Sequence, residues 1–232
     1  MSYGQNKPQG FKSSGSKTAA SFTGQIIQYP IKSGMTASIF TGDPVFLDAG
    51  YLVPATSSMK ANGQSNITGL PIGVFQGCEW WSTDPNVMGP SKSPYWPANT
   101  QTKVASPANA WVINDPNATW NIQVSSSAGG DYKNATVKQE QIGSGAQWAI
   151  DGKAFNQVNG QDISANPTTG SIETGQSGVY LDAATIKSST DAGFVNCPII
   201  ILDFVPMPGN APGLPFNNVI VGWNPNFQPK TN

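Results

Sequence analysis

Residues 38–55 read SIFTGDPVFLDAGYLVPA, and this stretch decides the class of fold. Three short apolar runs, at 38–40, 45–47 and 51–53, are separated by the segments TGDP and DAG. Gly, Pro and Asp are the residues that tight turns require, and apolar runs of this length suit strands. The stretch therefore predicts strand, turn, strand, turn, strand, at the spacing found in small barrels and sandwiches.

The same pattern continues along the chain. Further strand-length runs lie at 26–29, 70–78, 110–113, 120–124, 147–150, 178–181, 199–202 and 218–223. The turn-forming segment NDPN separates 110–113 from 120–124, so this pair predicts a hairpin. Gly73 and Gly77 interrupt the run at 70–78, which indicates a bulge or a close approach of two backbones.

We therefore predict an all-β fold, a single β-barrel or β-sandwich domain with long loops and extended polar termini. Its expected parts are a flexible N-terminal arm at 1–21, a β-rich domain at 22–224 and a C-terminal tail at 225–232. No stretch of ten or more residues has convincing helical periodicity, so helix is expected only in short turns, such as one near 153–158. Residues 79–109 are expected to form a long irregular stretch.

The composition fits an assembly protein and a secreted polar β protein about equally. Charged residues make up only 11% of the chain, against roughly 25% in ordinary globular domains. A surface with so few charges repels its neighbours weakly and suits dense packing, although a secreted polar β protein would have a similar composition. The net charge is −1 and no Lys-rich run occurs, so we expect no nucleic-acid binding.

The chain shows no membrane or export signal. The N-terminal residues are polar, and the longest apolar run, 199–205, contains Asp203 and has the length of a strand. We expect no signal peptide, no membrane span and assembly in a reducing cytoplasm. Cys78 and Cys197 are then expected to be buried free thiols rather than a disulfide.

Catalytic patterns are sparse. The chain has no His, so the usual general base of acyl transfer is missing, and two distant cysteines do not make a zinc site. A calcium loop among the turn aspartates and a glycosidase carboxylate pair remain open as alternatives. We predict that the protein is not an enzyme and needs no cofactor.

One aromatic cluster has functional potential. Trp80, Trp81, Tyr95 and Trp96 fall in the long stretch between two strand regions. They can pack beneath that stretch as a small satellite core, anchor a contact with another subunit, or form a flat platform for a sugar. All three interpretations stay open from the sequence.

Several blocks of the chain resemble a family of tailed-bacteriophage virion proteins. The blocks are SIFTGDPVFLDAGYLVPA, GLPIGVFQGCEWW, SPYWPANT, AWVINDPNATWNIQV, TGQSGVYLDAATI and PIIILDFVPMPGNAPG, and they extend from about Ile31 to Asn224. The resemblance implies a capsid decoration (cement) protein on the outer surface of the virion head, assembled in the host cytoplasm. Its implied partners are the major capsid protein and its own copies, as a trimer or another homo-oligomer.

Other virion roles also fit the residues. The alternative is a tail or surface module that binds a receptor or glycan through the aromatic cluster. A hydrolytic virion enzyme ranks last, because the chain offers no catalytic pattern.

The N-terminal arm suggests how such a protein would grip its neighbours. Tyr3 and Phe11 are its only aromatic anchors, while Lys7 and Lys12 can meet acidic patches. Ordering a Gly- and Ser-rich segment costs roughly 1–2 kcal/mol per residue, which binding must offset. We predict that the arm lies across another subunit, a second copy or the major capsid protein; a passive leader is the alternative.

Overall fold

The computed structural model describes residues 9–17, 25–54, 71–87, 89–103, 106–126, 135–149 and 170–225. The strands are β1 (Lys12–Ser16), β2 (Ile26–Ile31), β3 (Ile39–Phe40), β4 (Pro44–Asp48), β5 (Tyr51–Pro54), β6 (Gly73–Trp81), β7 (Pro90–Ser93), β8 (Tyr95–Trp96), β9 (Ala108–Ile113), β10 (Ala118–Ser125), β11 (Gly145–Ala149), β12 (Tyr180–Lys187), β13 (Ile199–Phe204) and β14 (Asn218–Trp223). The only helical elements in these ranges are two 3-10 turns, η3 (Gln139–Gln141) and η4 (Ala192–Asn196). The all-β prediction is confirmed, whereas the helical turn expected near 153–158 lies outside the described residues.

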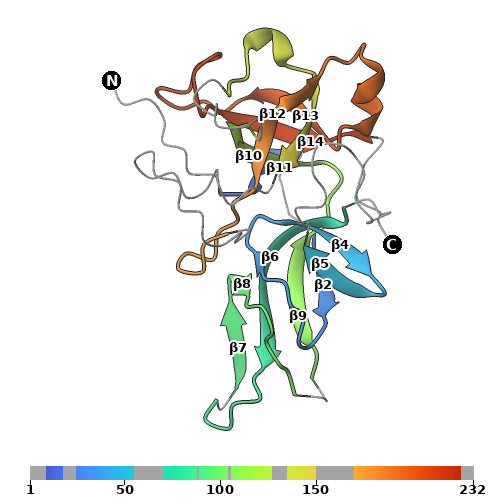
Figure 1. Cartoon of the computed structure of the whole chain (residues 1–232), viewed down its shortest axis with the longest axis vertical. Coiled ribbons are helices and arrows are strands. Elements are labelled where there is room, and N and C mark those ends of the chain that lie inside the picture. The colour runs from blue at the N-terminus through green and yellow to red at the C-terminus, as the bar shows by residue number, and fades with distance from the viewer. Residues whose placement is uncertain are drawn as a thin grey trace.

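A closed barrel forms the C-terminal half, at the top of Figure 1. Its strand order is β10-β12-β11-β13-β14, and β14 pairs again with β10 to close the ring. Only the β10–β12 pair is parallel. Closure removes the open edges that a flat sheet would expose.

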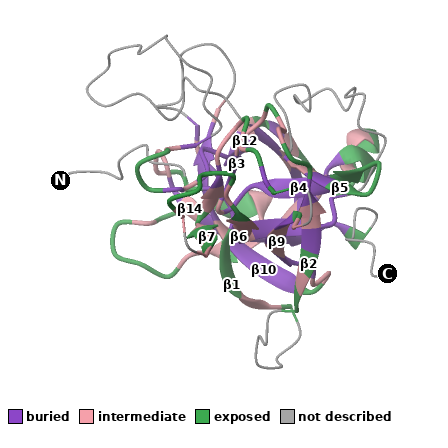
Figure 2. Ribbon diagram, turned by 90° about the horizontal axis from the view of Figure 1, so that it is seen from below, coloured by how far each residue is buried: buried purple, intermediate pink, exposed green. Residues whose placement is uncertain are grey.

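The barrel interior is aromatic. Trp120, Trp148 and Trp223 surround Phe11, whose ring centroid lies 6.3, 5.9 and 5.8 Å from theirs, respectively. Aliphatic side chains from the alternating inward positions, such as Ile122, complete this core. Figure 2 shows the barrel strand β10 as a largely buried ribbon.

Phe11 and β1 correct part of the prediction of a flexible N-terminal arm at 1–21 that lies across another subunit. Residues 12–16 form β1, which pairs antiparallel with residues 118–121 of β10, and Phe11 is only 1% exposed. The prediction underestimated a single aromatic side chain, because the three tryptophans around it come from distant parts of the sequence. Residues 1–8 and 18–24, and residues 226–232 of the expected C-terminal tail, lie outside the described residues.

A second sheet lies below the barrel in Figure 1. Its strand order is β2-β9-β6-β4-β5, with β7 added along the far end of β6, and β3 and β8 form a separate small pair. Successive residues of its strands face two different cores. Val74 and Ile113 join the barrel core, whereas Phe75 and Val112 belong to the core of the second sheet. The strands β6 and β9 of the second sheet thus contribute side chains to both cores, which packs the two halves together.

The hairpin predicted from 110–113 and 120–124 is wrong. The two strands exist as β9 and β10, but they belong to different sheets. Both edges of β9 are already paired, with β2 and β6, so β10 has no free edge to join. Asn114 fixes the crossing between the sheets: its N–H donates to the Gln25 carbonyl at 3.0 Å and its side-chain amide to the Tyr29 hydroxyl at 2.9 Å.

The glycines of β6 behave as predicted. The register between β6 and β9 shifts between Phe75 and Gly77, which marks a bulge. At Gly73, a Cβ atom would lie 2.2 Å from the carbonyl oxygen of Ile113. This close approach of backbones leaves room for no side chain.

The stretch 79–109, expected to be irregular, is partly sheet. β6 continues to Trp81, and β7 pairs with it from Cys78–Ser93 to Trp81–Pro90. The five prolines at 85, 90, 94, 97 and 107 masked the strands in the sequence. Pro90 is tolerated because β7 lies on the edge of the sheet, where a missing N–H costs little, and Pro94 lies between β7 and β8.

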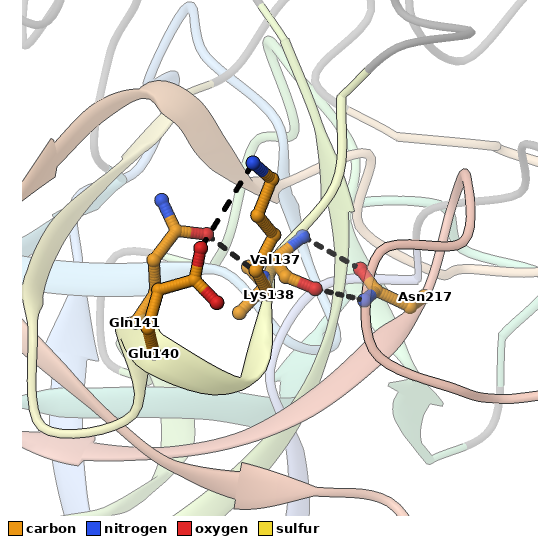
Figure 3. A network of polar contacts seen from close by, with 5 residues as sticks. All are labelled: Val137, Lys138, Glu140, Gln141 and Asn217. Atoms are coloured by element: carbon orange, nitrogen blue, oxygen red, sulfur yellow. Dashed lines mark hydrogen bonds and ion pairs between the residues drawn. The ribbon is translucent and has the colours of Figure 1, made fainter.

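A buried amide joins the segment before η3 to the start of β14. The side chain of Asn217 accepts a hydrogen bond from the Val137 N–H at 3.3 Å and donates one to the Val137 carbonyl at 2.9 Å (Figure 3). Asn217 thereby replaces a strand partner for Val137, whose side chain lies in the barrel core. The neighbouring Lys138–Glu140 ion pair is exposed and contributes little.

Candidate functional site

The structure places the four aromatic residues singled out in the sequence in different environments. Trp96 is fully buried and meets Trp80 edge to face at 5.4 Å, while Tyr95 stacks on Phe40 at 5.5 Å. A direct interface role for Trp96 is therefore wrong: it lies in the core of the second sheet, and Trp80 packs against that core. Trp81 is different, because it is 40% exposed at the end of β6.

Trp81 belongs to a solvent-facing patch that we name the tryptophan face. The patch comprises Glu79 and Trp81 of β6, Lys92 of β7, Trp111 of β9, and Lys103. Strand pairing brings these residues together, since Glu79 is opposite Lys92 and Gly77 is opposite Trp111. Cys78 and Ala110, which alternate with them, point into the opposite, buried side of the sheet.

A glycine and two lysines contact the indoles of the tryptophan face. The indole of Trp111 lies over Gly77, where an added Cβ would sit 3.5 Å from its Cε3 atom. Lys92 Nζ lies 5.8 Å from the Trp111 ring centroid, and Lys103 Nζ lies 5.8 Å from that of Trp81. Each contact is a cation–π pair that contributes roughly 0.5–1 kcal/mol at an exposed site. The two indoles are thus held in place while part of their surface stays accessible.

Trp111 was missed in the sequence, although a signal was present. In the strand run ANAWVI, the polar residue Asn109 lies two positions before Trp111, so the two share one face of the strand and Asn109 marks that face as the outward one. A large aromatic side chain at an outward position is a better candidate for a contact surface than one in an irregular stretch. The Lys92–Glu79 ion pair beside it, at 3.6 Å, is largely exposed and orients the lysine more than it stabilises the fold.

Of the N-terminal residues expected to contact a partner, only some lie in the described part of the chain. Tyr3 and Lys7 lie outside the described residues. Lys12 is exposed, and its ammonium donates to the side-chain oxygen of Gln9. Both line a groove of about 280 Å³ on the outside of the barrel, together with Gly10, Asn121, Gln123, Val205, Met207 and Asn218. Its walls offer amides, one cation and one thioether, and no carboxylate.

A buried carboxyl lies where the two sheets meet. Asp43 is fully buried and accepts a hydrogen bond from the Phe40 N–H at 2.8 Å. Burial raises the pKa of Asp43 to about 7, and hydrogen bonds from the Ser177 hydroxyl and the Phe40 N–H only partly oppose this shift. The same turn joins three segments, because the Gly42 carbonyl accepts from Phe11 N–H and the Gly42 N–H donates to the Phe75 carbonyl.

The two cysteines are free and buried, in agreement with the sequence prediction. Burial raises the pKa of Cys78 to about 12 and also raises that of Cys197. Both thiols are therefore protonated and unreactive near neutral pH.

Two features are absent from the described residues. No three His, Cys, Asp or Glu side chains gather there as ligands for a metal ion. None of the helical elements described has the length and apolar character needed to cross a membrane.

Comparison with known proteins adds no relative. No family model, no curated protein and no solved structure matches this chain. Any function must therefore be argued from the residues and surfaces described above.

Proposed function

We propose that the protein is a capsid decoration protein of a tailed bacteriophage, which binds the major capsid protein and its own copies on the outer surface of the head. The observation that supports this best is the tryptophan face. Exposed indoles held on a rigid sheet are typical anchors of protein interfaces, since they bury a large area with little loss of side-chain entropy.

The rest of the surface fits the same role. Only 11% of the residues are charged, so copies can pack closely without strong mutual repulsion. A closed barrel with an aromatic interior provides a rigid body to which contact surfaces are attached. The sequence resemblance to virion proteins implies the partner, and the tryptophan face is the surface we assign to it.

The test is binding to heads that lack the protein. Trp81→Ala is expected to weaken binding at least about ten-fold, as for an interface anchor. Tyr51→Ala is the matched control, because Tyr51 is an aromatic residue with 41% exposure against 40% for Trp81 and lies on another strand. Equal binding of both variants would remove the tryptophan face from the interface. If the unaltered protein does not bind heads at all, the decoration role itself fails.

A tail or surface module that binds glycans is the second candidate. It is favoured by the amide-lined groove beside Lys12, in which Asn121, Gln123 and Asn218 offer hydrogen-bonding partners to hydroxyl groups. Copy number separates the two roles. A quantitative gel of purified particles should show a decoration protein at roughly the abundance of the major capsid protein, and a receptor-binding module in a small number of copies.

A further inference from the structure

Strand β1 is an N-terminal piece in a barrel that is otherwise built from the C-terminal half of the chain. Its partner β10, and the tryptophans that enclose Phe11, all follow residue 117 in the sequence. Between β1 and β10 the chain passes through the whole second sheet. The residues that form the site of β1 are thus distant from β1 in the sequence.

The contacts of β1 are concentrated at a few points. Phe11 fills the space between the three tryptophans, and its N–H donates to the Gly42 carbonyl at 2.9 Å. At the other end, Lys17 Nζ donates to the Trp223 carbonyl at 2.5 Å, where Gly222 leaves room for its side chain. The residues between, 12–16, are polar and mostly exposed. The segment therefore binds as a short peptide with one buried anchor and one capping cation.

The covalent tether does not restrict β1 to its own barrel. The Lys17 N–H donates to the Asn117 carbonyl, and the Asn114 N–H donates to the Gln25 carbonyl, so both ends of the tether attach to the same four-residue turn. Such a turn spans about 14 Å at most, whereas the chain from Lys17 to Gln25 can reach about 27 Å. The chain from Lys17 to Gln25 can therefore connect β1 to the barrel of another copy whose turn at 114–117 lies within about 27 Å.

We propose that β1 is exchanged between copies, so that residues 10–17 of one molecule complete the barrel of another. Through its own Phe11 and Lys17, the exchanged segment makes the same contacts with the other barrel as it makes within one chain. The local concentration of copies therefore decides which arrangement forms. Dense packing on a shell raises that concentration. The inference rests on the self-association part of the proposed function and supplies its mechanism: each copy holds the next by an inserted strand.

The test uses two differently tagged single-cysteine variants, Lys12→Cys and Asn121→Cys. These positions are directly opposite each other in the β1–β10 pair, and both lie on the outer surface of the barrel. The two variants are unfolded, mixed, refolded together at high concentration and oxidised mildly. A disulfide-linked product that carries both tags is expected, and adding Phe11→Ala to the Lys12→Cys copy should lower its yield at least about five-fold.

Three controls make the result decisive. A single chain with both substitutions reports the intramolecular arrangement by closing its own disulfide. Lys12→Cys mixed with Lys92→Cys, on the second sheet, should give no linked product. The unaltered protein, with Cys78 and Cys197 buried, should give none either.

The proposal is overturned if the double variant closes efficiently but the mixed single variants never link at any protein concentration. That outcome would leave head binding through Trp81 untouched. Conversely, efficient exchange in a protein that does not bind heads would overturn the decoration role and leave strand exchange standing.

Discussion

The barrel and the second sheet use tryptophan in opposite ways. In the barrel, Trp120, Trp148 and Trp223 point inward and are almost fully buried around Phe11. In the second sheet, Trp81 and Trp111 point outward on a surface bordered by lysines. The same residue type thus stabilises one half of the molecule and gives the other half a contact surface.

Position on the strand, and not residue type, decides the role of each indole. On a strand, alternate side chains face opposite sides of the sheet, so a shift of one residue would move a tryptophan from core to surface. Trp80 and Trp81 show this within one strand: Trp80 packs against the inner core of the sheet, and its neighbour Trp81 faces solvent. The comparison predicts that substitutions in the barrel affect stability and those on the tryptophan face affect binding.

The largest effect on stability is expected for Phe11→Ala. Removing a buried phenylalanine should lower the free energy of unfolding by about 3–5 kcal/mol, because it leaves a cavity between three tryptophans. Urea denaturation measures the loss. Lys12→Ala, at the exposed neighbouring position, is the control and should change stability by less than about 0.5 kcal/mol. A loss below about 1 kcal/mol for Phe11→Ala would show that β1 does not contribute to the barrel core.

The second effect concerns the junction between the two halves. The pKa of Asp43 is about 7 in the folded protein against an ordinary value of 3.8, so the folded state holds this proton more tightly than the unfolded state. Its contribution to stability is therefore complete below about pH 4 and is lost as the pH rises to about 7, by up to about 4 kcal/mol. Asp43→Asn keeps an acceptor for the Phe40 N–H but carries no charge.

Chemical denaturation across this pH range tests the junction. The Asn variant should match the unaltered protein near pH 4 and exceed it in stability at pH 8. Parallel stability curves for the two proteins from pH 4 to pH 8 would contradict the raised pKa of Asp43. They would also contradict its cause, which is the burial of the carboxyl group.

The smallest effect on stability is expected on the tryptophan face. Trp81→Ala should lower the free energy of unfolding by less than about 1 kcal/mol, because the side chain is 40% exposed and loses mainly its contact with Lys103. Thermal unfolding measures this. A loss as large as that of Phe11→Ala would mean that Trp81 is part of a core, and a loss of head binding in the same variant would then report damage to the fold.

Local patterns in the sequence determined the class of fold and most of the strands. The runs around residues 45–47, 199–202 and 218–223 became β4, β13 and β14, because alternation, apolar content and turn residues act over a few neighbouring positions. The bulge at the glycines of β6 followed from an equally local argument.

Tertiary structure alone decided how the strands are paired and which aromatic residues are buried. β9 and β10 look like a hairpin in the sequence, but β9 is already paired on both sides and β10 joins the barrel instead. Phe11 lies in a segment that is polar by composition, yet it is buried because three tryptophans distant in sequence enclose it. Strand pairing and burial depend on partners far along the chain, and no local pattern contains them.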